Sequence, residues 1–229
     1  MAIVLELQEE ALKSDADILS LLRKSSLIAR KLDLKDFHEW LNNELNGYES
    51  GSNIPDYRII SGELKGWNPY QGWIPVIAPN NELEKMFNTR RIPNSMPSLN
   101  DLLLEGHSEL SISIPAEMNA YFSKLFTFET VFKIMVPKNV IRNIIEQVKN
   151  KLLDWAITLE ENGILGEELR FTNEEKIKAQ NEPQIVNYIS NFYGPIIDTQ
   201  VQQGTTNSKQ KLYKNSTNKA KQNKNSRKI

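Results

Sequence analysis

Cysteine is missing from this chain of 229 residues, and histidine occurs only at His38 and His107. The lack of cysteine excludes disulfide bonds, thiolate nucleophiles and zinc sites with sulfur ligands. The longest uninterrupted apolar runs are a few residues long, far below the roughly 20 residues that span a bilayer. The first residues, MAIVLELQEEALKSD, have no cationic stretch before their apolar residues and do not resemble a secretory signal. We expect a cytoplasmic protein without a membrane partner.

The familiar catalytic motifs are missing as well. The sequence has no P-loop, no GxGxxG turn, no GxSxG elbow and no HExxH helix. The glutamates between residues 160 and 175 come as adjacent pairs, which point apart around a helix instead of converging on one ion. We therefore expect no metal site and no cofactor.

Acidic residues are missing from the end of the chain. Residues 205–229 carry seven Lys and one Arg, whereas the whole chain has a net charge of −1, so the preceding residues carry a net charge of −9. An acidic body repels phosphate groups, and any contact with nucleic acid is expected to come from this tail. The cations of the tail are Lys209, Lys211, Lys214, Lys219, Lys221, Lys224, Arg227 and Lys228.

Apolar residues at helical spacing are the strongest pattern that is present. Residues 18–48 contain two such stripes, which break near Asp33 and stop at Gly47, and they predict a helical hairpin. Residues 139–161 predict the longest helix, ended by Gly163. The segments between them contain short β-type patterns separated by turns, and residues 80–97 predict an irregular connection.

These patterns predict an α+β fold. It consists of an N-terminal helical hairpin, a small β-rich middle, a long central helix packed on the strands, and a C-terminal extended strand followed by a disordered basic tail. We assign residues 1–182 to the α+β domain, 183–208 to a Gln-rich extended strand and 209–229 to the tail, which has too few apolar residues to order itself.

Three stretches of the sequence resemble one protein family. The first, LLRKSSLIARKL followed by FHEWLNNELNGY, is similar to the N-terminus of the AbiTii family, and ENGILGEELRFTNEEKIKA is the second stretch with this likeness. Segments similar to QIVNYISNFYGPIIDTQVQQGTTNS follow the AbiTii domain in other proteins. The resemblance implies a bacterial protein that acts in abortive infection, a form of antiphage defence.

Glu44, His38 and Arg23 are the candidates for a catalytic site, although no established motif contains them. In the functional interpretation, Glu44 belongs to a ligand or partner surface, with Arg23 of the preceding helix as its counter-charge. In the structural interpretation, Glu44 forms an ion pair and Gly47 stops the helix so that Tyr48 folds back onto Trp40. We favour the structural interpretation, and a surface or capping role for His38.

Aromatic residues offer a second candidate site. Trp67, Tyr70 and Trp73 in GWNPYQGW could form a platform for a base or a sugar, although aromatic residues more often close a turn over the core. Together with Trp40 and Tyr48 they form the expected ligand or partner surface.

The extended segment near the C-terminus predicts self-association. Ile197, Thr199, Val201 and Gln203 alternate with polar residues, and glutamines on a strand gain most when strands stack in register. We expect a homo-oligomer, with a partner protein from a defence operon as a further candidate.

The leading functional hypothesis is an interaction or effector module of antiphage defence that assembles through its C-terminal strand. One alternative is a toxin enzyme that cleaves or modifies nucleic acid, using His38, Glu44 and Arg23. The other is an accessory protein that binds nucleic acid through its basic tail.

Overall fold

The computed structural model describes residues 1–78, 80–104, 109–125 and 130–181. The chain divides into two units, residues 1–195 and 196–229, and every described residue belongs to the first. The described part is α+β, as the sequence predicts, with helices and two small antiparallel sheets. The predicted strand at 183–208 and the predicted disordered tail lie outside the described residues.

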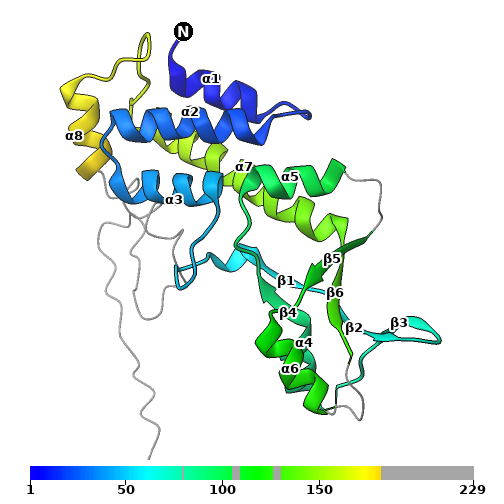
Figure 1. The fold of residues 1–229 in the computed structure, drawn as a ribbon. Coiled ribbons are helices and arrows are strands. Elements are labelled where there is room, and N and C mark those ends of the chain that lie inside the picture. Colours follow the sequence, from blue (N-terminus) through cyan, green and yellow to red (C-terminus); the bar gives the residue numbers. More distant parts are fainter. Residues whose placement is uncertain (79, 105–108, 126–129, 182–229) are drawn as a thin grey trace, which may run out of the picture. The chain divides into compact units, whose positions relative to one another are not determined.

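Three helices form the N-terminal part, drawn in blue in Figure 1: α1 (Ile3–Ala11), α2 (Ile18–Lys31) and α3 (Lys35–Asn46). The Asp17 carboxylate caps α2 by accepting hydrogen bonds from the backbone N–H groups of Leu19 and Ser20. Asp33, with φ 57°, reverses the chain between α2 and α3, which pack against each other as the predicted hairpin. The Nζ atom of Lys24 on α2 binds Glu6 and Glu10 of α1 at 3.6 and 2.6 Å.

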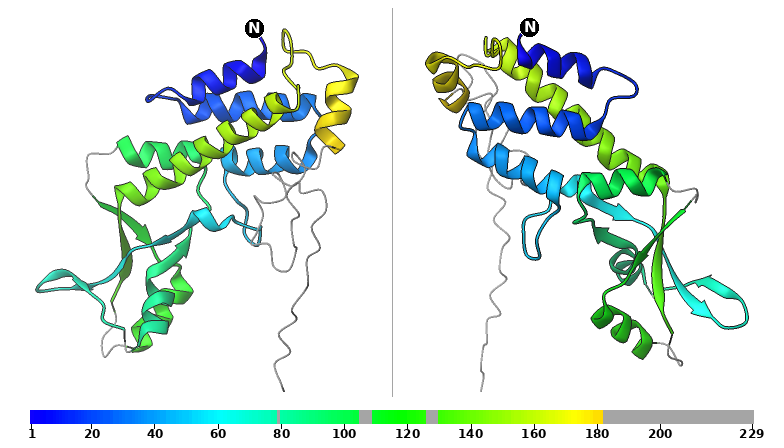
Figure 2. Two further views of the ribbon diagram at one scale, coloured as in Figure 1. Left: turned by 180° about the vertical axis from the view of Figure 1, so that it is seen from behind. Right: turned by 45° about the horizontal axis from the view of Figure 1, so that its top comes forward.

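The longest helix, α7 (Lys138–Glu161), runs beside α1, α2 and α5 (Met96–Leu104), as Figure 2 shows. Its buried stripe includes Ile145, Leu152 and Trp155. The sequence places this helix on the strands, but the structure places it mainly against other helices, and its contact with the sheet is a smaller one to β6 (Phe132–Pro137). The reason is that its apolar stripe continues along the whole helix, whereas β6 directly precedes the helix in the chain.

Four strands form the larger sheet in the order β3–β2–β6–β5, and every neighbouring pair is antiparallel. A second, two-stranded sheet pairs β1 with β4 after the short 3₁₀ helix η1 (Asp56–Arg58). The bounds of the strands are Ile59–Ser61 for β1, Glu63–Asn68 for β2, Gly72–Pro75 for β3, Thr89–Arg91 for β4 and Glu109–Ser113 for β5.

One face of the four-stranded sheet packs against α4 (Asn81–Asn88) and α6 (Ala116–Leu125) through aromatic rings. The ring of Phe122 on α6 lies 4.6 Å from that of Phe87 on α4 and 5.5 Å from that of Phe132 on β6, centroid to centroid. The prediction of an irregular connection over residues 80–97 is therefore wrong, because this segment contains α4 and β4. Helix α4 has only eight residues and one fully buried side chain, Phe87, so its sequence contains few repeats of the helical pattern.

The last described helix is α8 (Asn173–Asn181), which follows the loop that leaves α7. Thr172 caps it, because the Thr172 hydroxyl accepts a hydrogen bond from the Glu175 N–H at 3.1 Å. Among the described residues, no helix is long and apolar enough to cross a membrane.

Candidate functional site

A buried ion pair joins Glu44 of α3 to Arg58 of η1. Both side chains are fully buried, and the guanidinium donates through Nε to Oε1 at 3.0 Å and through Nη2 to Oε2 at 2.5 Å. This two-bond geometry is the one that a planar guanidinium forms best with a carboxylate. Burial alone would lower the pKa of Arg58, but the hydrogen bonds and the charge of Glu44 outweigh it and raise that pKa.

Two tyrosines complete the coordination of the Glu44 carboxylate. The hydroxyls of Tyr48 and Tyr57 each donate to Oε1 at 2.6 Å, and the Trp40 indole N–H donates to the Tyr57 oxygen at 2.8 Å. Burial, followed by the negative charge of Glu44, raises the pKa of both tyrosines well above the usual value. These tyrosines therefore remain protonated donors. We call Trp40, Glu44, Tyr48, Tyr57 and Arg58 the Glu44 cluster.

The remaining donors of Arg58 bind the backbone. Its Nη1 donates to the carbonyls of Ile92 and Asn94 at 3.0 and 2.7 Å, and the Tyr48 N–H donates to the Pro93 carbonyl at 2.8 Å. Gly47 makes this approach feasible, because its φ of 95° disfavours other residues and a Cβ there would lie 3.0 Å from the Pro93 oxygen. The Glu44 cluster thus fastens the end of α3 to η1 and to residues 92–94.

Lys151 of α7 lies beside the Glu44 cluster. Its Nζ is 5.4 Å from the centroid of the Tyr57 ring, and burial lowers the pKa of this lysine. The amine therefore adds a positive charge next to the carboxylate, and it ties the long helix to the same cluster.

The three catalytic candidates of the sequence do not meet in one site. Arg58, not Arg23, is the counter-charge of Glu44, and Arg23 is exposed on α2. His38 is half-buried, and its Nδ1 lies 3.2 Å from the Asn42 amide nitrogen. Since His38 and Glu44 are six residues apart on α3, their side chains point about 120° apart around the helix. Within the described part of the chain, no three histidine or acidic residues are grouped to hold a metal ion.

Sequence reasoning missed Arg58. The signal that could have found it is the position of Glu44 on the apolar stripe of α3, because a buried carboxylate requires a cation or several donors from another element. The functional interpretation of Trp40 and Tyr48 as an accessible surface is wrong, because these residues are 0% and 7% exposed. Their rings and polar atoms belong to the Glu44 cluster.

The accessible aromatic residues lie on the β2–β3 hairpin instead. The rings of Trp67 and Trp73 pack edge to face with centroids 5.4 Å apart, and the two residues stand directly opposite each other. Tyr70 in the turn is 96% exposed. The Asn68 carboxamide shapes this turn by accepting hydrogen bonds from the N–H groups of Tyr70 and Gln71.

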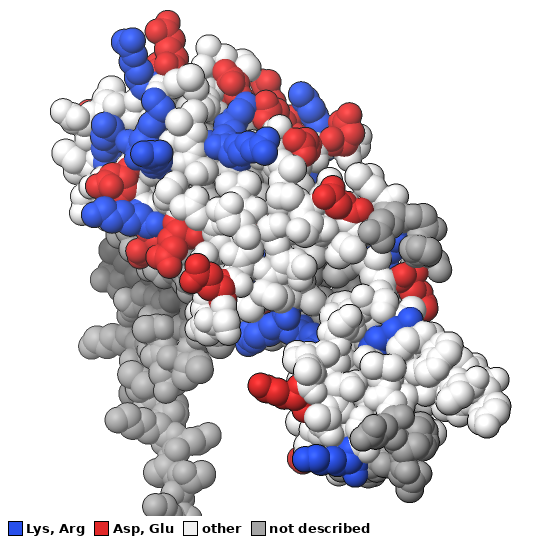
Figure 3. Space-filling model, viewed as in Figure 1, with Lys and Arg blue, Asp and Glu red and all other residues white. Residues whose placement is uncertain are grey.

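A cleft of about 950 Å³ lies between this hairpin and α6. It is lined on one side by Trp67, Asn68 and Tyr70, and on the other side by residues of α6 that include Asn119 and Lys124. Its volume is that of an ordinary small-ligand site. Figure 3 shows few charged side chains over this hairpin, at the lower right, whereas charges of both signs cover the helices.

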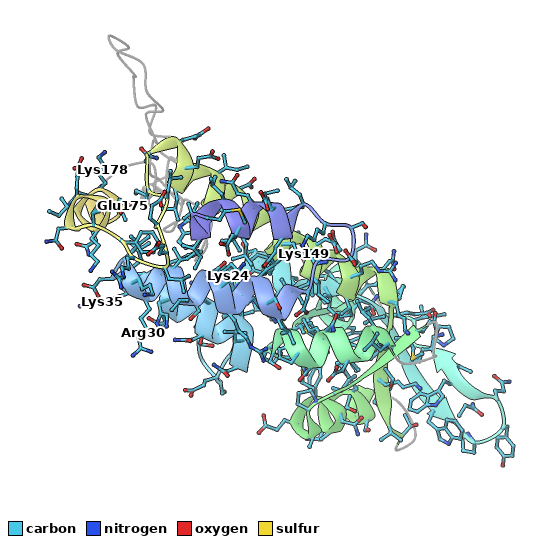
Figure 4. All side chains as sticks on the ribbon, turned by 90° about the horizontal axis from the view of Figure 1, so that it is seen from above. Lys24, Arg30, Lys35, Lys149, Glu175 and Lys178 are labelled. Atoms are coloured by element: carbon cyan, nitrogen blue, oxygen red, sulfur yellow. The ribbon has the colours of Figure 1, made fainter. Side chains whose placement is uncertain are left out.

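The loop between α7 and α8 is organised by a single carboxylate. Glu175 accepts hydrogen bonds from the N–H groups of Leu165, Gly166 and Thr172 at 3.0, 3.1 and 2.7 Å. Figure 4 labels Glu175 and Lys178 on α8, and Lys178 forms an ion pair with Glu174. Burial works against the charged form of Glu175, but these backbone hydrogen bonds outweigh it and lower the pKa.

Comparison with known proteins places these features in a family. The model of the AbiTii family matches residues 2–184 of the chain. The chain belongs to the AbiTii family. The match includes both the Glu44 cluster and the Glu175 loop of this AbiTii protein. Comparisons with curated proteins and with solved structures gave no match.

Membership of the AbiTii family implies a role in abortive infection, a bacterial antiphage defence. Two predicted sites of this AbiTii protein lie outside the described residues. They are the oligomerisation residues Ile197, Thr199, Val201 and Gln203, and the eight cations of the tail.

Proposed function

We propose that this AbiTii protein acts in abortive infection as a binding and assembly component. The contrast between its two candidate sites carries the proposal. The carboxylate of Glu44 is fully buried and takes part in hydrogen bonds with Arg58 and two tyrosines, so a substrate has no access to it. The rings of Trp67 and Tyr70 are exposed at the edge of an open cleft, as in a surface that binds a partner.

The assembly part of the proposal assigns self-association to residues 183–208. The alternating pattern of Ile197, Thr199, Val201 and Gln203 supports it. A strand with unpaired backbone edges is available to pair with other copies of the chain.

Light scattering tests the assembly part. We expect the full-length protein and a chain ending at residue 208 to form the same oligomer, and a chain ending at residue 181 to be monomeric. The chain ending at residue 208 is the matched control, because it lacks only the basic tail. Monomeric mass for all three chains would refute self-assembly, and an oligomer that persists in the shortest chain would refute its assignment to residues 183–208.

Phage plating on cells that express each variant tests the binding part. We expect the double substitution Trp67→Ala with Tyr70→Ala to abolish protection while the protein remains folded. Tyr121→Ala, which removes a 48% exposed ring from α6 outside the cleft, is the control that retains protection. The proposal would be overturned in favour of catalysis if a folded Glu44→Gln variant gave no protection while Trp67→Ala with Tyr70→Ala still protected the cells.

A further inference from the structure

The four-stranded sheet has a second face that α4 and α6 do not cover. On β2, β5 and β6, the core-facing residues alternate with residues that are exposed or half-buried. The pairing register places Lys65 opposite Lys133, Glu63 opposite Met135 and Trp67 opposite Trp73 on this second face. We call it the open face of the sheet.

The open face carries an aromatic pair next to a cation. Trp67 and Trp73 are 42% and 36% exposed, and the Nζ atom of Lys133 lies 4.0 Å from the centroid of the Trp73 ring. Trp67 also lines the cleft beside α6, so the open face and the cleft meet at this residue. Lys133 thus covers one face of the Trp73 ring, and the exposed parts of both indole rings offer surface for stacking beside a positive charge.

Two lysines are directly opposed on the open face. Lys65 of β2 and Lys133 of β6 are register partners, and like charges in this position repel each other. Glu63 offsets part of this repulsion through an ion pair with Lys65 at 3.1 Å. Ser113 of β5 stands opposite Lys133 on its other side, so donors from three neighbouring strands form one row. An anion with several oxygens would remove the repulsion and accept hydrogen bonds from this row.

The cleft adds donors of the same kind. Among the described residues of its lining, Lys124 is the charged one and none is acidic. A ligand that matches rings, lysines and hydroxyls has flat apolar groups alternating with negative charges. Unpaired bases joined by phosphates have this chemistry, and aromatic stacking accepts every base.

We propose that the open face of the sheet binds single-stranded nucleic acid, with bases on Trp67 and Trp73 and phosphates on Lys65 and Lys133. This inference rests on the proposed binding function and names its ligand class. A duplex does not fit, because its bases are paired and stacked and cannot reach the indole rings. The proposed site uses rings as well as cations, whereas the basic tail offers only cations for contact with phosphates.

Fluorescence anisotropy with the full-length protein tests this ligand class. The probes are labelled 12-nucleotide oligo-U RNA, oligo-dT DNA and a 12-base-pair DNA duplex, each at three salt concentrations. We expect Trp67→Ala with Trp73→Ala to weaken binding of a single-stranded probe by about tenfold or more, because each stacked base contributes about 1–3 kcal/mol. The ratio of the RNA and DNA affinities shows whether the 2′-hydroxyl is recognised.

The lysine pair has its own signature. Lys65→Gln with Lys133→Gln should weaken binding and reduce the slope of log affinity against log salt by about 1.4, the value for two phosphate contacts on a single strand. The matched control is Lys35→Gln with Lys178→Gln, which makes the same change in net charge on α3 and α8 and should leave binding unchanged. Trp67→Phe with Trp73→Phe should retain most of the affinity.

Several outcomes would overturn the proposal. The first is that the wild-type protein binds neither single-stranded probe, and the second is that it binds the duplex as tightly as a single strand. The third is that Trp67→Ala with Trp73→Ala binds as tightly as wild type while its melting temperature is unchanged. The fourth is that only deletion of residues 209–229 abolishes binding. The binding function itself fails separately, because its test is phage plating. If the tryptophan variant loses nucleic acid but still protects cells, nucleic acid is not the ligand that protection requires.

Discussion

Glu44 shows how one buried charge organises its surroundings. A carboxylate on the apolar stripe of α3 loses its hydration when the helix packs, which costs several kcal/mol unless other groups replace the water. Arg58, Tyr48 and Tyr57 supply four hydrogen bonds to its two oxygens. Because each donor comes from a position after the end of α3, the ion pair fixes where the chain goes next.

Neutralising Glu44 should destabilise the fold strongly. Glu44→Gln leaves the buried Arg58 without its counter-charge, and we expect a loss of about 3–5 kcal/mol in the free energy of unfolding. Urea unfolding followed by tryptophan fluorescence measures this loss. Glu39→Gln, on an exposed position of the same helix, is the control and should change stability by less than about 0.5 kcal/mol. Equal stability of the two variants would contradict a structural role for the pair.

The lowered pKa of Glu175 predicts a pH-dependent contribution to stability. The folded state holds this pKa below its ordinary value of 4.5, so the unfolded state binds more protons between the two values. The stabilisation by the Glu175 carboxylate is therefore complete above the ordinary pKa, and it is lost as the pH falls through the folded value.

Thermal unfolding of wild type and Glu175→Gln between pH 7 and pH 3 checks this sign. At pH 7 the melting temperature of the wild type should be higher than that of Glu175→Gln, and this difference should shrink as the pH falls. Glu174→Gln removes the same charge from a side chain that is 81% exposed, and its difference from wild type should be smaller at pH 7. If the difference in melting temperature between wild type and Glu175→Gln grew on acidification, the lowered pKa of Glu175 in the folded state would be refuted.

Helix α7 packs against three of the described helices, α1, α2 and α5. Leu152 is fully buried on it, whereas Ile157 is 37% exposed one and a half turns later. We expect Leu152→Ala to cost about 2–5 kcal/mol of unfolding free energy, because it leaves a cavity. Ile157→Ala should cost less than about 1 kcal/mol, and denaturant unfolding compares the two. A cost for Ile157→Ala as large as that for Leu152→Ala would contradict the described packing.

The elements differ in how far sequence alone could predict them. The stripes of α2, α3 and α7 repeat over three or more turns, so local spacing was sufficient to place these helices. Helix α4 has eight residues and one buried side chain, and strand β4 has three residues, so neither contains enough repeats to stand out. The pairing of β2 with β6 joins segments about 70 residues apart, which no local pattern specifies.

The same limit applies to the candidate sites. The sequence favoured a structural ion pair for Glu44, but its partner Arg58 lies in another element, and no local spacing links the two residues. The aromatic surface was partly predictable, because Trp67 and Trp73 flank a turn at positions where a hairpin places them opposite each other. Sequence alone could not show that Trp67 and Trp73 are exposed whereas Trp40 is buried, because exposure depends on tertiary packing.

At the scale of the whole molecule, we expect the described residues to fold without the residues that follow them. The buried apolar residues of the described part lie between Ala2 and Ala179. We expect a chain ending at residue 181 to unfold in one cooperative transition within about 2 °C of the full-length protein, as measured by differential scanning calorimetry at low protein concentration. A loss of more than about 8 °C, equivalent to several kcal/mol, would show that residues after 181 complete the core.

Strand β6 ends at Pro137 and α7 begins at Lys138, so no connecting residue separates the sheet from the long helix. A change in the direction of β6 at this junction would change the direction of the helix. A helix of 24 residues is about 36 Å long, and tilting its first turn by about 5° would move its far end by about 3 Å. A rotation of β6 that carried α7 with it as a rigid body would therefore be amplified at Gly163, where the loop held by Glu175 begins.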